Sequence, residues 1–132
     1  MIALIDTHIL VWWFERSKRL SAAQRRVLAK ANSDRPLAVA DVTLWEVALL
    51  VEAGRLRLSI PVDAWLATAT AAPLVERLGM SPAIAREMIS LTPTRGWDLA
   101  DRVLVATARV LNLPLVTSDT RIIDAGLVTT IE

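Results

Sequence analysis

The chain has 132 residues, of which 54% are hydrophobic, and a formal net charge of +1 at pH 7. This length suits one folded domain with its own core, and we expect a single domain over residues 1–132. The absence of cysteine excludes disulfides and cysteine-ligated metals. No apolar run is long enough to span a membrane, and Asp6 interrupts any signal-like start. We therefore expect a cytoplasmic protein.

The basic residues are dominated by arginine. Of the 15 Lys and Arg residues, only Lys18 and Lys30 are lysine. The planar guanidinium suits phosphate and carboxylate recognition. Codon usage in a GC-rich genome produces the same excess of arginine. Recognition of anionic groups and genome composition therefore both explain this excess.

The first half of the chain alternates short apolar segments with helical patterns. We predict strands at Ile2–Ile5 and Leu37–Ala40, helices at Thr7–Phe14, Ala22–Ala31, Val42–Ala53 and Val62–Ala69, and a short extended segment at Arg55–Ile60. Thr7 and Ser21 are the predicted caps of the first two helices. Gly54 is placed to end the third helix, as glycine often does.

The second half continues the alternation. We predict strands at Leu74–Leu78, Leu115–Thr117 and Leu127–Ile131, helices at Pro82–Ser90, Leu99–Leu111 and Ser118–Ala125, and a loop at Thr92–Trp97. Short apolar strands that alternate with helices indicate a parallel sheet with helices on both faces. The predicted fold is therefore a three-layer α/β/α sandwich around a mostly parallel sheet of four to five strands.

Five acids lie on segments that such a sheet brings to one edge. Asp6 follows the first strand, Glu46 lies in the helix after the second, Asp98 and Asp101 begin an apolar helix, and Asp119 follows the next strand. Two carboxylates about 5 Å apart repel by roughly 3 kcal/mol at an effective dielectric near 20. Such a group must protonate, stay hydrated or hold cations. Carboxylate ligands without a His or Cys cluster suit Mg²⁺ or Mn²⁺, which can activate water against a phosphodiester.

Helix capping explains several of these acids as simply. Glu46 completes a capping-box pattern three residues after a threonine, and Asp98 and Asp119 both stand at N-cap positions. Asp101 can complement a helix dipole. Asp6 is the hardest to explain in this way, because a buried acid at a strand end needs a partner.

Four stretches of the chain resemble the PIN-domain family, and more narrowly VapC-type toxins of type II toxin–antitoxin systems. They are LIDTHILVWW, TLWEVALLVEAGRLRL, WDLADRVLVATARVLNLPLVTSD and the short tail that follows. Together they cover nearly the whole chain in the family's order. The resemblance implies a PIN-like fold and assigns the family's catalytic, metal-binding acids to Asp6, Glu46, Asp101 and Asp119.

The resemblance also implies a function. It implies an endoribonuclease that binds one or two Mg²⁺ or Mn²⁺ ions per subunit and hydrolyses phosphodiester bonds in RNA with metal-activated water. The implied partners are a cognate VapB-type antitoxin, which holds the toxin inactive, and a second copy in a homodimer, with no membrane. The alternative is a non-catalytic PIN scaffold that acts through protein contacts, and the intact set of acids argues against it.

Other residues near the acids have supporting roles in this interpretation. Thr7, Asp98 and Ser118 are candidates to orient the carboxylates or to cap helices. His8, the only histidine, is expected to be structural. Trp97 could stack on an RNA base, and packing against a partner explains it equally well.

Overall fold

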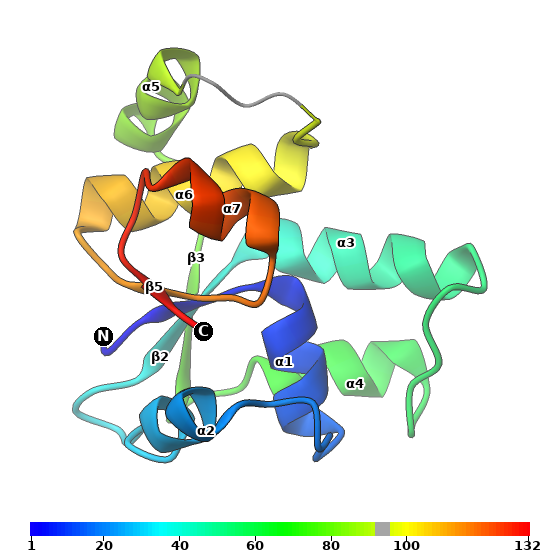
Figure 1. Cartoon of the computed structure of the whole chain (residues 1–132). Coiled ribbons are helices and arrows are strands. Elements are labelled where there is room, and N and C mark those ends of the chain that lie inside the picture. The colour runs from blue at the N-terminus through cyan, green and yellow to red at the C-terminus, as the bar shows by residue number, and fades with distance from the viewer. Residues whose placement is uncertain (92–95) are drawn as a thin grey trace.

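The computed structural model describes residues 1–91 and 96–132 (Figure 1). Its strands are β1 (Leu4–Ile5), β2 (Leu37–Ala40), β3 (Val75–Leu78), β4 (Leu115–Val116) and β5 (Thr130–Ile131). Its helices are α1 (Thr7–Phe14), α2 (Ala22–Leu28), α3 (Asp41–Glu52), α4 (Val62–Ala69), α5 (Pro82–Ser90), α6 (Leu99–Leu111) and α7 (Thr120–Ala125). Among the described residues, no helix is long and apolar enough to cross a membrane.

The strands form one sheet in the order β3-β2-β1-β4-β5, and every neighbouring pair is parallel. Leu4 of β1 pairs with Ala38 on one side and with Leu115 on the other. This arrangement confirms the predicted sandwich around a parallel sheet. Because β1 and β4 are neighbours, the segments that follow them emerge side by side at the carboxyl edge of the sheet.

The strands alternate their side chains between two cores, as a sheet covered on both faces requires. Ile5, Val39 and Val116 face the layer of α1, α2 and α4, whereas Leu4 and Leu115 face the layer of α5, α6 and α7. Figure 1 shows these two helical layers on opposite sides of the sheet.

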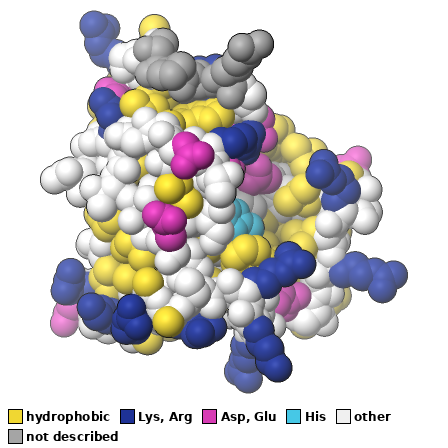
Figure 2. Space-filling model, viewed as in Figure 1, with side chains coloured by type: hydrophobic (Ala, Val, Ile, Leu, Met, Phe, Trp, Pro, Cys, Tyr) yellow, Lys and Arg dark blue, Asp and Glu magenta, His cyan; other side chains and the backbone are white. Residues whose placement is uncertain are grey.

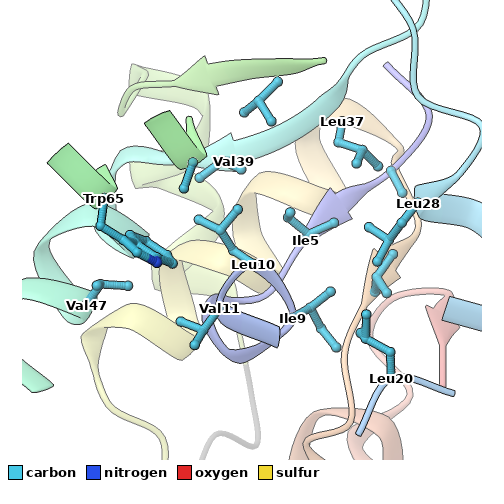
Figure 3. Packing of buried hydrophobic residues seen from close by; sticks show 14 residues of the cluster. Ile5, Ile9, Leu10, Val11, Leu20, Leu28, Leu37, Val39, Val47 and Trp65 are labelled. Carbon is cyan, nitrogen blue, oxygen red and sulfur yellow. The ribbon is translucent and has the colours of Figure 1, made fainter. Parts of the chain in front are cut away.

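The first core is built around a tryptophan. Trp65 of α4 is fully buried and packs against Phe14, with ring centroids 5.2 Å apart. Figure 3 shows it in the same cluster as Val47 of α3, Leu10 of α1 and Val39 of β2. The indole packs between α1, α3 and α4, and α1 and α3 supply residues that line the site described below.

The predicted bounds agree with the structure for α1, β2, α4, α5 and α6 and differ by a few residues for the other helices and strands. Residues 55–60 form an irregular connection without a strand, and positions 92–95 of the predicted loop lie outside the described residues. One predicted cap is wrong. The N-cap of α1 is Asp6, whose side chain accepts the backbone N–H of Thr7, because the acid at the strand end has the extended backbone that an N-cap needs.

Candidate active site

Four elements bring the predicted acids to one cavity of about 250 Å³. Its lining includes Asp6, Glu46, Asp98, Asp101 and Asp119. Figure 2 shows this hollow at the face where the single histidine, in cyan, lies below the acidic groups, in magenta. The sequence prediction that these acids share one edge of the sheet is confirmed in its geometry.

Asp6 directly follows β1 and is buried, with 5% of its surface exposed. Its Oδ1 accepts the backbone N–H of Thr7 at 2.7 Å, and its Oδ2 accepts the hydroxyl of Thr117 at 2.6 Å. His8 Nδ1 lies 3.5 Å from Oδ2. The buried carboxylate therefore has the partners that its position requires.

Thr117 was not singled out by sequence reasoning, yet it joins two of the acids. Its hydroxyl donates to Asp6 Oδ2 at 2.6 Å and accepts the backbone N–H of Asp119 at 3.0 Å. It follows the last residue of β4, so the pairing of β4 with β1 places this hydroxyl beside Asp6. A threonine directly before Ser118-Asp119 is the only signal that the sequence offers for this role.

Asp98 and Asp101 form a capping box at the start of α6. Asp98 Oδ1 accepts the N–H of Asp101 at 3.0 Å, and Asp101 Oδ2 accepts the N–H of Asp98 at 3.3 Å. The prediction that Asp98 caps this helix is confirmed. Burial, together with the charges of Asp98 and Asp119, raises the pKa of Asp101 to about 6, although Arg121 and the Asp98 N–H oppose the shift.

Glu46 reaches the cavity from the second turn of α3 and caps nothing. The helix begins at Asp41, and its N-cap, Ala40, has no side-chain cap. The hydroxyl of Thr43, which the capping-box interpretation needed, lies 3.2 Å from the Thr7 hydroxyl. Burial raises the pKa of Glu46, and the charges of nearby acids add to this effect, while the Thr7 side chain opposes it.

Asp119 caps α7 and is paired with an arginine that sequence reasoning missed. Its Oδ1 accepts the backbone N–H of Arg121 at 3.0 Å, and the guanidinium donates through Nε at 3.2 Å and Nη2 at 2.7 Å. Arg121 Nη2 also lies 3.1 Å from Asp101 Oδ2. These contacts lower the pKa of Asp119 and raise that of Arg121. No sequence pattern showed that this side chain would turn back into the cavity.

The remaining candidates have structural contacts. The Ser118 hydroxyl accepts from Gln24 Nε2 at 2.9 Å and has no hydrogen bond to an acid among the described residues. The Ser118 N–H donates to His8 Nε2 at 3.1 Å. Because Nε2 accepts, the neutral imidazole carries its proton on Nδ1, toward Asp6. Trp97 is half-buried and packs against the core beside α6.

The acids of the cavity form a donor set of the kind that a divalent cation prefers. They offer carboxylate oxygens, the ligands that Mg²⁺ and Mn²⁺ prefer. Burial, with a smaller contribution from neighbouring negative charges, raises the pKa of both Glu46 and Asp101. Within residues 1–91 and 96–132, however, no three acidic or imidazole side chains converge on one point. Asp119 instead points toward Arg121.

Comparison with known proteins identifies the family. The family model described as PIN domain matches residues 3–127, and the chain belongs to this family. The chain is also 36% identical to Ribonuclease VapC22 of Mycobacterium tuberculosis over 119 residues, which cover 90% of this chain and 88% of the relative.

Two solved structures share the fold. One is VapBC2 from Rickettsia felis bound to a DNA fragment from its promoter, with a TM-score of 0.70 and 16% identity, covering 98% of this chain and 97% of that chain. The other is a toxin–antitoxin complex from Klebsiella pneumoniae, with a TM-score of 0.66 and 22% identity, covering 98% and 96%. At these identities the likeness establishes the architecture.

Proposed function

We propose that the protein is a metal-dependent endoribonuclease and the toxin of a type II toxin–antitoxin pair. The observation that carries this proposal is the meeting of Asp6, Glu46, Asp101 and Asp119, from four separate elements, around one cavity. The 36% identity to a protein named as a ribonuclease supports RNA as the substrate.

In this proposal the four acids hold one or two Mg²⁺ or Mn²⁺ ions. When bound, such an ion supplies Lewis acidity and a nucleophile derived from water at neutral pH. The chain's own groups set the positions of the ligands. Thr117 and the Thr7 N–H fix both oxygens of Asp6, and the capping box with Asp98 fixes Asp101 on α6.

We extend the proposal to the partners. The Rickettsia structure is a VapBC2 assembly and the Klebsiella structure is a toxin–antitoxin complex, which supports a VapB-type antitoxin as the partner of this chain. The proposal also includes a homodimer and a cytoplasmic location, as the family resemblance implies. The exposed apolar side chains of α3, Trp45 and Leu49, are 51% and 42% exposed. Trp45 is thus outside the core, and apolar surface of this kind suits protein contacts.

RNA cleavage by the purified chain in the presence of Mn²⁺ tests this proposal. We expect Asp6→Asn and Asp101→Asn to lower the cleavage rate by at least about 100-fold, because each removes a charged ligand of the cation. Asp41→Asn is the matched control, since Asp41 lies at the same edge of the sheet but pairs with Arg77 at 2.9 Å, outside the cavity.

Two results would contradict the proposal. One is cleavage by Asp6→Asn at the rate of the unmodified chain. The other is cleavage that persists unchanged in excess EDTA. A chain that binds a protein partner and cleaves no RNA under any condition would favour the non-catalytic scaffold.

A further inference from the structure

We propose that the Arg121 guanidinium serves as the counter-cation of the acidic cavity. It must leave Asp101 and Asp119 before these carboxylates can bind a divalent cation. This inference rests on the proposed function, because it assumes that the cavity is a cation site. It adds an internal competitor that sets the affinity of that site.

The contacts of Arg121 are those of a cation held between two acids. Its fork meets both oxygens of Asp119, through Nε at 3.2 Å and Nη2 at 2.7 Å. The same Nη2 lies 3.1 Å from Asp101 Oδ2, and Nη1 donates to the carbonyl of Gly96 at 2.7 Å. A fork that meets a carboxylate with two parallel bonds is the strong form of this ion pair. Arg121 thereby ties α7 to the start of α6.

The same contacts explain why no three carboxylates of the described residues converge. Both oxygens of Asp119 accept bonds from Arg121, so they are not free to join Asp6 and Asp101. Asp6 keeps its own partners, Thr7 and Thr117, which do not depend on Arg121. Release of this one side chain would therefore free carboxylate oxygens of Asp101 and Asp119, two acids that already line the cavity.

Arg121 can make this exchange at little structural cost. Its side chain is 49% exposed, whereas those of Asp101 and Asp119 are 10% and 18% exposed. It is the second residue of α7, and the cap of that helix is the bond from its backbone N–H to Asp119. The guanidinium can thus move to solvent without uncapping the helix or opening the core.

Calorimetric titration of Mn²⁺ into the full chain tests the inference. We expect Arg121→Gln to bind Mn²⁺ about tenfold more tightly than the unmodified chain, since a charge-assisted ion pair no longer competes with the cation. Arg121→Lys should lie between the two, because it keeps the charge and loses the fork.

Arg19→Gln is the matched control for charge alone. Arg19 lies over the ring of Trp12, with Cζ 5.8 Å from the ring centroid, and Trp12 lines the same cavity. This variant removes one positive charge near the cavity without touching a carboxylate. Equal tightening by Arg19→Gln and Arg121→Gln would overturn the inference, because a general field effect would then explain both.

A second readout follows the side chain itself. In ¹H–¹⁵N spectra, the Arg121 Nε–H signal, assigned by its loss in Arg121→Lys, should shift on saturation with Mg²⁺ as it loses Asp119. An unchanged signal at saturation would overturn the inference. Mn²⁺ binding with equal affinity in the unmodified chain and Arg121→Gln would also overturn it while leaving the proposed function intact. No binding to either protein would overturn both.

Discussion

At the scale of one residue, Asp101 shows how the acidic cavity lowers the free energy of unfolding of the chain at neutral pH. Burial and the charges of Asp98 and Asp119 raise its pKa from 3.8 to about 6, even though Arg121 lies beside it. A carboxyl group whose pKa is higher in the folded chain than in the unfolded chain binds protons more readily when folded. The contribution of Asp101 to the free energy of unfolding therefore falls as the pH rises from 3.8 to about 6, and it stays at its lowest value above that range.

Replacement of this charge gives a prediction with a defined sign. At pH 7.5 we expect Asp101→Asn to raise the free energy of unfolding by on the order of 1 kcal/mol, a value discounted for screening of the charge by solvent. The gain should shrink toward zero at pH 4, where the native group is largely protonated. Asp34→Asn, at an exposed turn, should change stability by less than about 0.5 kcal/mol at both pH values. Chemical denaturation measures all three proteins, and a loss of stability in Asp101→Asn at pH 7.5 would contradict the electrostatic explanation.

Individual residues also show which parts of the site can be predicted from the sequence. Asp6 and Asp101 are predicted from their places, Asp6 after a strand and Asp101 in the first turn of an apolar helix, and the structure brings both to the cavity. Arg121 and Thr117 could not be predicted in the same way. Their roles depend on side-chain directions at the ends of α7 and β4, and neither hydrophobic period nor capping pattern determines those directions.

At the scale of elements, the parallel pairing of β1 with β4 sets the positions of Asp6 and Asp119 relative to each other. Leu4 and Ile5 pair with Leu115 and Val116, and one residue further on the Thr117 hydroxyl joins Asp6 to the backbone of Asp119. The pairing of central strands thus continues as a side-chain contact at the edge of the sheet. The geometry of the site is a consequence of this strand order.

A pair of matched variants tests the role of the Thr117 hydroxyl in orienting Asp6. We expect Thr117→Val to weaken Mn²⁺ affinity by about tenfold, because Asp6 loses a hydrogen bond that orients it, and to destabilise the chain by about 1 kcal/mol. Thr107→Val removes another buried hydroxyl, which donates to the Val103 carbonyl at 2.6 Å within α6. It should leave Mn²⁺ affinity unchanged. Equal loss of affinity in both variants, measured by calorimetry, would show that Thr117 acts only through stability.

The elements themselves were largely predictable. β2 and α6 combine a strong apolar pattern with clear end signals, and their predicted bounds agree with the structure. The edge strand β5 was predicted at Leu127–Ile131 and spans Thr130–Ile131. An edge strand has one neighbour to pair with, so its length depends on β4, a contact distant in sequence that local pattern does not contain.

At the scale of the whole molecule, the fold assembles one acidic cavity from segments spread along most of the chain. Asp6 and Asp119 stand 113 positions apart in the sequence and line the same cavity because β1 and β4 are neighbours. Helices α3 and α6 add Glu46 and Asp101 to the lining of the same cavity. Our central claim is that this cavity is a divalent-cation site that serves RNA cleavage.

Anomalous diffraction from crystals of the chain soaked with Mn²⁺ tests that claim most directly. We expect an anomalous peak inside the cavity within coordination distance of carboxylate oxygens of Asp6 and Asp101, with Arg121 turned away from Asp119. Crystals of Asp6→Asn, soaked under the same conditions, should show a much weaker peak or none. A cavity without manganese density at saturating Mn²⁺, or density only at sites remote from these carboxylates, would contradict the claim.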